Sequence, residues 1–166
     1  MKAVIIHHTK TGHTRRASAD VAEGLEARGV DVTILQAKAM TGWDVDEQDI
    51  IVVASPCHAG SLSIRAGIAR PILSLLKKLE ANTLKDKIAG ALSVNCAYGG
   101  KKTVDAIEKH LQAAGARIPQ QGPVVRAGVP LSLFKGPMAS KTVRNQLREF
   151  GYALACAAED DNQTVE

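Results

Sequence analysis

The chain has 166 residues, of which 45% are hydrophobic and 23% are charged, and its formal net charge is +4. This length and composition suit a single α/β domain with a packed core, and they argue against a disordered chain. No run of about 18 apolar residues is present, which argues against a membrane-spanning helix. The three cysteines are widely spaced, so we expect no disulfide framework and a cytoplasmic, reducing location.

The charge is unevenly distributed along the chain. The last eight residues hold four carboxylates and no Lys or Arg, so residues 1–158 carry a net charge of +8. A basic body attracts acidic proteins, nucleic acids or anionic small molecules. The basic residues are scattered and aromatic residues make up only 3% of the chain, so nucleic acid is not the expected partner.

Strand-like and helix-like segments alternate along the sequence. Short apolar runs predict strands, the last of them short, irregular and at an edge because it holds Pro119 and Pro123. Amphipathic periodicity predicts helices, and we expect Pro71 to kink or divide the second of them. In chain order we expect strand 2–7, helix 14–28, strand 30–35, a loop over 36–48 with at most a brief helix, strand 49–54, loop 55–61, a helix ending near Glu80, strand 87–94, loop 95–100, helix 102–114, strand 116–126, loop 127–137 and helix 140–157.

This alternation predicts a parallel sheet with helices on both faces, a three-layer α/β sandwich. We expect one domain over residues 1–157 and an acidic, disordered tail over 158–166. In parallel sheets ligands bind outside the carboxyl ends of the strands. The loops 7–14, 55–61 and 95–100 all follow predicted strands and should lie together at that edge.

The first of these loops has the character of a phosphate-binding turn. Thr9, Thr11 and Thr14 surround Gly12 between a strand and a helix, where backbone N–H groups and the helix dipole favour an anion. The alternative is an ordinary helix cap or a hydroxyl-stabilised turn without a ligand. The Gly-Lys-Ser/Thr of a Walker loop and a Gly-x-Gly-x-x-Gly fingerprint are both missing here. A phospho-acceptor receiver domain would need acidic residues at the ends of the first and third strands, which are also missing.

Other residues at this edge leave alternatives open. Cys57 and Cys96 each follow a buried strand, so they are either two small buried groups or a pair of neighbouring redox-active thiols. Several histidines converge on the same edge, but none has the spacing of a known zinc motif, and we expect no metal. Trp43 is expected to fill the core.

Three motifs together resemble those of the flavodoxin family. The family's phosphate loop reads roughly Thr/Ser-x-Thr-Gly-Asn-Thr, and residues 9–14 read Thr-Lys-Thr-Gly-His-Thr. Residues 55–60 read Ser-Pro-Cys-His-Ala-Gly where the family often has Ser-Pro-Thr-Tyr-x-Gly, and residues 98–100, Tyr-Gly-Gly, loosely match the aromatic and glycine-rich loop after the fourth strand. The resemblance covers essentially the whole chain.

The resemblance implies a flavodoxin-like fold with strand order 2-1-3-4-5, FMN as cofactor and electron transfer to a redox partner protein. The phosphate would sit on the first loop, with Ser55 as a further candidate, and the isoalloxazine ring between the other two loops. No side chain is expected to act as an acid or base. The expected cofactor-binding residues are Thr9, Lys10, Thr11, Gly12, His13, Thr14, Ser55, Pro56, Cys57, His58, Gly60, Asn95, Cys96, Tyr98 and Gly99.

Two departures from the family's pattern widen the range of functions. Cys57-His58 stands where many relatives stack a Tyr or Trp on the flavin, which leaves room for a substrate. Many flavodoxins are acidic, whereas this chain is basic and would suit an acidic partner. The alternatives are therefore an FMN-dependent reductase that passes electrons from a nicotinamide to a quinone-type acceptor, and an interaction module that has lost its cofactor. The oligomeric state is left open.

Overall fold

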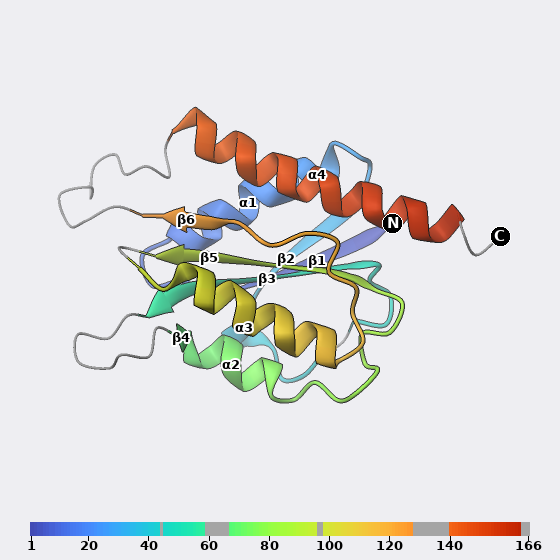
Figure 1. The fold of residues 1–166 in the computed structure, drawn as a ribbon, viewed down its shortest axis with the longest axis horizontal. Coiled ribbons are helices and arrows are strands. Elements are labelled where there is room, and N and C mark those ends of the chain that lie inside the picture. Colours follow the sequence, from blue (N-terminus) through green and yellow to red (C-terminus); the bar gives the residue numbers. More distant parts are fainter. Residues whose placement is uncertain (44, 59–66, 96–97, 128–139, 164–166) are drawn as a thin grey trace.

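The computed structural model describes residues 1–166 except 44, 59–66, 96–97, 128–139 and 164–166, and it shows a parallel sheet between two layers of helices (Figure 1). The main strands run in the order β2-β1-β3-β5-β6 and pair in parallel throughout, which confirms the predicted order 2-1-3-4-5. Their bounds are β1 Lys2–His7, β2 Asp31–Gln36, β3 Ile50–His58, β5 Ile88–Asn95 and β6 Val124–Arg126.

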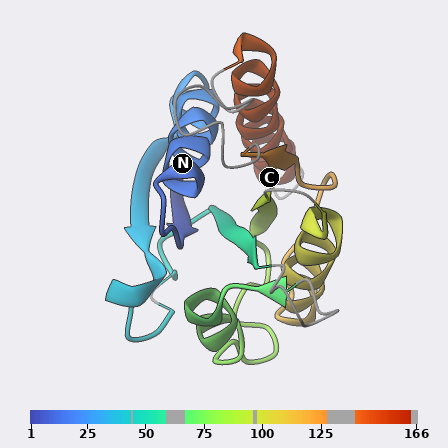
Figure 2. The same cartoon turned by 90° about the vertical axis from the view of Figure 1, so that its left-hand side faces the viewer.

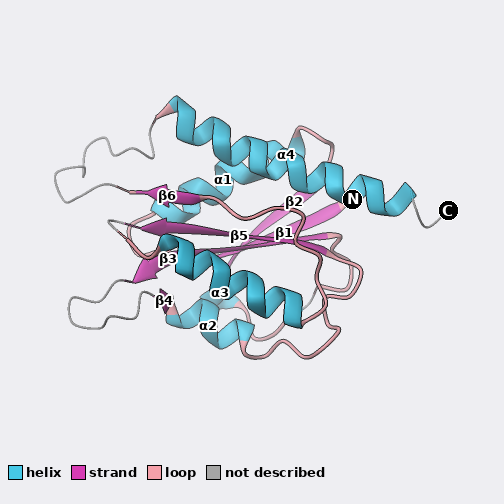
Figure 3. Ribbon diagram, viewed as in Figure 1, coloured by secondary structure: helices cyan, strands magenta, loops and turns pink. Residues whose placement is uncertain are grey.

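Helices cover the two faces of the sheet in pairs (Figure 3). One face packs against α1 (His13–Glu26) and α4 (Lys141–Gln163), and the other against α2 (Arg70–Leu76) and α3 (Gly100–Ala113). The link between β2 and β3 holds only the short 3-10 helix η1 (Ala37–Ala39), as its length predicted.

Side chains alternate between the two layers of the core, as they must in a strand buried on both faces. In β1, Ala3 and Ile5 pack on the α1 and α4 side, whereas Val4 and Ile6 pack on the α2 and α3 side. The unbroken apolar runs of β1, β3 and β5 therefore follow directly from the three-layer architecture. None of the helices in the described part of the chain is both long and apolar enough to cross a membrane.

The prediction of a loop from residue 55 onwards was wrong for its first four residues. Residues 55–58 continue β3, because Ser55 and Pro56 pair with β5 while Cys57 and His58 pair antiparallel with the short strand β4, Gly67–Ile68. Turn-forming residue types predicted the loop, but pairing with strands distant in sequence keeps the backbone extended. Residues 59–61, the rest of that predicted loop, lie outside the described residues.

Helices α2 and α4 differ most from their predicted bounds. Helix α2 begins at Arg70 with Pro71 in its first turn, where the missing N–H is not needed, and it ends at Leu76 rather than near Glu80. Helix α4 extends to Gln163, six residues beyond the predicted helix end at residue 157. The extension is held because Ala158 is buried and Arg117 bonds both the Ala157 carbonyl and Asp161.

Candidate functional site at the carboxyl edge of the sheet

Three segments far apart in sequence meet where the parallel strands end, the edge that faces the viewer in Figure 2. The backbone N–H of His8, just after β1, donates to the Ala54 carbonyl of β3 over 3.2 Å. The Cys57 thiol lies 3.5 Å from the Tyr98 carbonyl oxygen that precedes α3. The predicted convergence of the three loops is therefore seen in the residues that the structure describes.

The turn between β1 and α1 leaves the start of the helix open. Gly12 is the N-cap with a φ of 84°, a left-handed conformation that glycine adopts without strain, and no side chain among the described residues caps the helix. The Thr9 hydroxyl accepts a hydrogen bond from the Gly12 N–H over 2.9 Å and shapes the turn. The first intrahelical bond, from the Arg16 N–H to the Gly12 carbonyl, leaves the preceding N–H groups without helical partners, as at any helix start.

Buried polar side chains lie under and beside this turn. Thr14 and His7 are almost fully buried, and the Nδ1 atoms of His7 and His13 are buried without a hydrogen-bond partner among the described residues. Burial lowers the pKa of His7, and the charges of Arg15 and His8 lower it further. An uncapped helix start and exposed basic side chains together fit an anionic group.

Lys10 and Thr11 are exposed at the tip of the same turn, next to Gly12. Their side chains are thus accessible to a bound ligand. Which of residues 9–14 contact a cofactor stays a prediction.

Ser55 is already engaged within the protein. It is fully buried, its hydroxyl donates to the Pro56 carbonyl over 3.0 Å, and its Oγ accepts from the Ala69 N–H over 3.0 Å. This contact fixes the return of the chain through β4 into α2. Pro56 and Cys57 are half-buried, and neither Gly60 nor the His58 side chain belongs to the described residues.

The turn before α3 has the same form as the turn before α1. Gly99 is the N-cap with a φ of 87° and no side chain caps the helix. Tyr98 beside it is 68% exposed, and Asn95 is buried with its Oδ1 unpartnered among the described residues. An exposed aromatic ring next to an open helix start could cover one face of a planar ligand.

The remaining alternatives at this edge have different outcomes. Cys96 is not among the described residues, so its expected proximity to Cys57 stays a prediction. Within the described residues, no group of three or more His, Cys, Asp and Glu side chains could hold a metal ion. Trp43 packs against the core beside α2, where its indole N–H donates to the Leu75 carbonyl over 2.7 Å, as expected for a residue that fills the core.

Sequence reasoning missed the contribution of β4. Residues 67–69 close against the end of β3 and bring Arg70 to the same edge, although 12 or more residues separate them from Ser55 in sequence. The only sequence signal for this was the pair Gly67-Ile68 before Pro71, which is too short to identify a strand. His7 was weighed only as a metal ligand, whereas the structure shows a buried imidazole beside the turn, with no partner for its Nδ1 among the described residues.

The known proteins that resemble this chain share one fold. No protein-family model matches the chain. Flavodoxin FldP of Pseudomonas aeruginosa (strain UCBPP-PA14) is 26% identical over 114 residues, which span 68% of this chain and 61% of that relative's length. The whole relative's activity therefore does not follow from this match.

Solved structures of flavodoxins superpose over nearly the whole chain. A flavodoxin of Streptococcus pneumoniae TIGR4 has a TM-score of 0.76 at 22% identity and covers 95% of this chain and 99% of its own. An archaeal flavodoxin has a TM-score of 0.72 at 14% identity over 96% of this chain and 99% of its own. The rubredoxin oxygen:oxidoreductase of Desulfovibrio gigas matches with a TM-score of 0.76 at 19% identity, over 96% of this chain but 36% of its own.

Proposed function

We propose that this chain, which has a flavodoxin-like fold, binds FMN at the carboxyl edge of its sheet and passes electrons to a redox partner protein. The observation that carries the proposal is the open start of α1, where Gly12 is the N-cap and no described side chain caps the first N–H groups. A phosphate monoester carries about 1.5 to 2 negative charges at neutral pH, which this environment suits. The similarity to flavodoxins supplies the rest of the argument.

The residues of this chain would hold the cofactor from three sides. The phosphate would lie on the turn of residues 9–14, where Thr11 and Lys10 are exposed and the amides at the helix start are unpaired. The ring would lie between the end of β3 and the turn that carries Tyr98. When bound, FMN supplies the electron-carrying group, and the protein's part is to hold it, limit its contact with water and expose one edge to a partner.

Absorbance of the purified protein in the visible region tests the proposal, followed by titration with FMN while its fluorescence is monitored. We expect bound flavin, or quenching at micromolar FMN. A folded but colourless protein that leaves FMN fluorescence unchanged would contradict the proposal and favour an interaction module without a cofactor.

The double substitution Thr11→Val and Thr14→Val tests the phosphate turn itself. Removing hydrogen bonds to a charged group costs about 1.5–3 kcal/mol each, so affinity for FMN should fall by at least about tenfold. Thr33→Val, on the exposed surface of β2, is the matched control and should bind FMN as the parent does. Equal affinities in the double variant and the control would place the phosphate elsewhere.

The purified protein loaded with FMN also allows an electron carrier to be distinguished from a reductase. A carrier loaded with FMN should not oxidise a nicotinamide steadily unless another reductase is added. Steady oxidation by the isolated protein in the presence of a quinone would instead establish the reductase alternative. No observation in the structure favours that alternative.

A further inference from the structure

Basic residues predominate at the carboxyl edge of the sheet. In the part of this edge that the structure describes, the segments that follow the strands or begin the helices hold Lys, Arg and His but no Asp or Glu: residues 8–16, 36–43, 55–58, 67–71, 95, 98–102, 124–127 and 140–142. Six exposed cations lie at this edge but outside the phosphate turn, and we call them the basic rim: Lys38, Arg70, Lys101, Lys102, Arg126 and Lys141.

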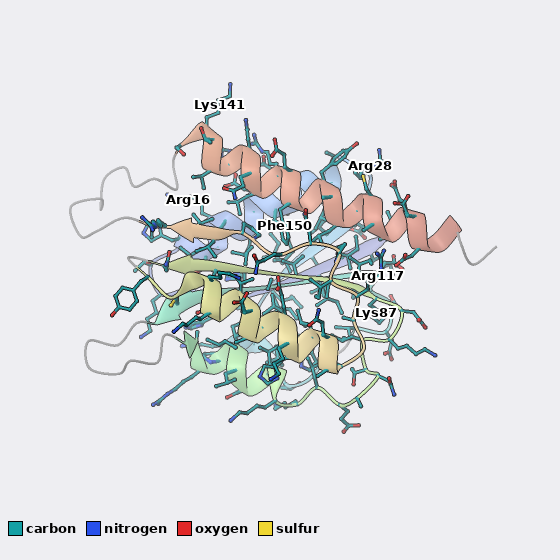
Figure 4. The ribbon with its side chains drawn as sticks, in the orientation of Figure 1. Arg16, Arg28, Lys87, Arg117, Lys141 and Phe150 are labelled. Atoms are coloured by element: carbon teal, nitrogen blue, oxygen red, sulfur yellow. The ribbon has the colours of Figure 1, made fainter. Side chains whose placement is uncertain are left out.

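The rim crosses the whole width of the sheet. Lys38 follows β2 at one side, Arg126 ends β6 at the other, and Arg70 starts α2 between them. Figure 4 shows Lys141 at the same end of the molecule as Arg16 of the first helical turn. The rim therefore surrounds the proposed cofactor site rather than lying on one side of it.

Most cations of the rim form no ion pair within the described residues. Lys101 pairs with Asp105 over 3.1 Å, and no ion pair forms at the other five members of the rim. Two arginines at the opposite end are paired, since Arg117 lies 2.7 Å from Asp161 and Arg28 pairs with Glu159 (Figure 4). Five positive charges of the rim are thus not offset by an ion pair in the described part of the chain.

The cofactor does not account for this charge. One phosphate monoester neutralises at most about two positive charges. The phosphate turn and the start of α1 together carry three exposed cations, Lys10, Arg15 and Arg16. Their charge already exceeds that of one phosphate before the rim is counted. A surface that keeps six further cations exposed around a redox site suits a larger anionic surface opposite it.

We infer, on the basis of the proposed function, that the redox partner is a protein with an acidic surface around its own redox centre, and that it docks on the basic rim. Exposed cations attract such a surface over about 10 Å at 0.1 M salt and raise the association rate by about 10- to 1000-fold. Single-stranded nucleic acid is disfavoured because Tyr98 is the sole exposed aromatic residue in the described part of this edge. Electron transfer itself demands a redox-active partner.

The test compares two triple variants with equal net charge. Lys38→Gln, Lys102→Gln and Lys141→Gln remove three of the six charges of the rim and leave the phosphate turn unchanged. Lys77→Gln, Lys85→Gln and Lys109→Gln remove three exposed charges away from that edge. Circular dichroism and FMN titration first establish that both variants fold and load like the parent.

The first readout is the rate at which ferricyanide, a trianion, oxidises the reduced FMN-loaded protein. Two ferricyanide ions each accept one electron from fully reduced FMN, giving two ferrocyanide ions and oxidised FMN, with the flavin's protons released to the buffer. We expect the rate to fall steeply as salt rises, and the rim variant to react about fivefold or more slowly than the control variant at low salt. Hexaamminecobalt(III), a trication, should show the opposite trend. Equal rates in the two variants would overturn the inference.

The second readout needs no cofactor, so it stands even if FMN fails to bind. Binding of the chain to poly-L-glutamate, a DNA duplex and phosphatidylserine vesicles is measured under the same conditions. We expect binding to poly-L-glutamate that the rim variant loses and the control variant keeps. Binding to DNA or vesicles without binding to poly-L-glutamate, or equal losses in both variants, would refute an acidic protein partner. Absence of FMN binding with rim-dependent binding to poly-L-glutamate would contradict only the proposed function.

Discussion

Replacing Gly24 with alanine should destabilise the protein by about 2 kcal/mol, because α1 and α4 approach each other through their backbones at this residue. A Cβ at Gly24 would overlap the backbone carbonyl of Arg148, which cannot rotate away as a side chain would. Overpacking costs about 1–3 kcal/mol, and a collision with backbone belongs at the upper end of that range. Alanine favours the helical conformation by about 1 kcal/mol relative to glycine, and this gain reduces the expected destabilisation to about 2 kcal/mol.

Urea unfolding and thermal melting measure this effect directly. For a chain of this length, about 2 kcal/mol corresponds to a fall in Tm of about 4–8 °C. Gly42→Ala is the matched control, because a Cβ there meets nothing and its φ is not positive. That variant should be neutral or stabilised by up to about 1 kcal/mol through the unfolded chain.

A second glycine provides an internal check on the mechanism. A Cβ at Gly151 in α4 would overlap the Val21 carbonyl of α1, so Gly151→Ala should also destabilise. Once one substitution has separated the helices, the second should cost less than it does alone. Full additivity, or a Gly24→Ala variant as stable as Gly42→Ala, would refute the reasoning.

Two further predictions concern other buried polar groups. Trp43→Phe removes the indole N–H that donates to the Leu75 carbonyl, so it should lower the free energy of unfolding by about 1 kcal/mol. Urea unfolding followed by circular dichroism measures this change. Because the pKa of His7 is lowered in the folded state, the unfolded chain binds more protons below the ordinary histidine pKa of about 6.5. Stability should therefore be full above that pH and fall as pH decreases through it. His7→Gln should reduce that slope, and an unchanged slope in this variant would contradict the assignment.

The sheet was predictable from sequence because its central strands are buried on both faces. Such strands must be apolar throughout, and the runs in β1, β3 and β5 are unbroken. The extension of β3 was not predictable. Pro56 and His58 carry no strand signal, and they remain extended only because β5 and β4 lie beside them.

The candidate site was predictable as a location but not in its internal contacts. Parallel strands place their following loops at one edge, so the sequence alone predicts that the turns at Gly12 and Gly99 lie at the same edge. The engagement of Ser55 with Ala69 could not be foreseen, because it depends on how the chain returns to α2. Likewise, α4 continues beyond Ala157 through tertiary contacts that local sequence does not encode.

Helix α1 links the rigidity of the fold to the site at its end. Its middle is held against α4 by backbone contact at Gly24 and by Arg144, which bonds the nearly buried carboxylate of Asp20 over 3.0 Å. Its first turn, in contrast, is uncapped and points at the carboxyl edge. Groups that bind an anion gain most when they are fixed before the anion arrives, since little ordering then remains to oppose binding. Because the clamp with α4 begins only two turns below Gly12, the open amides are held in place by the same packing that stabilises the domain.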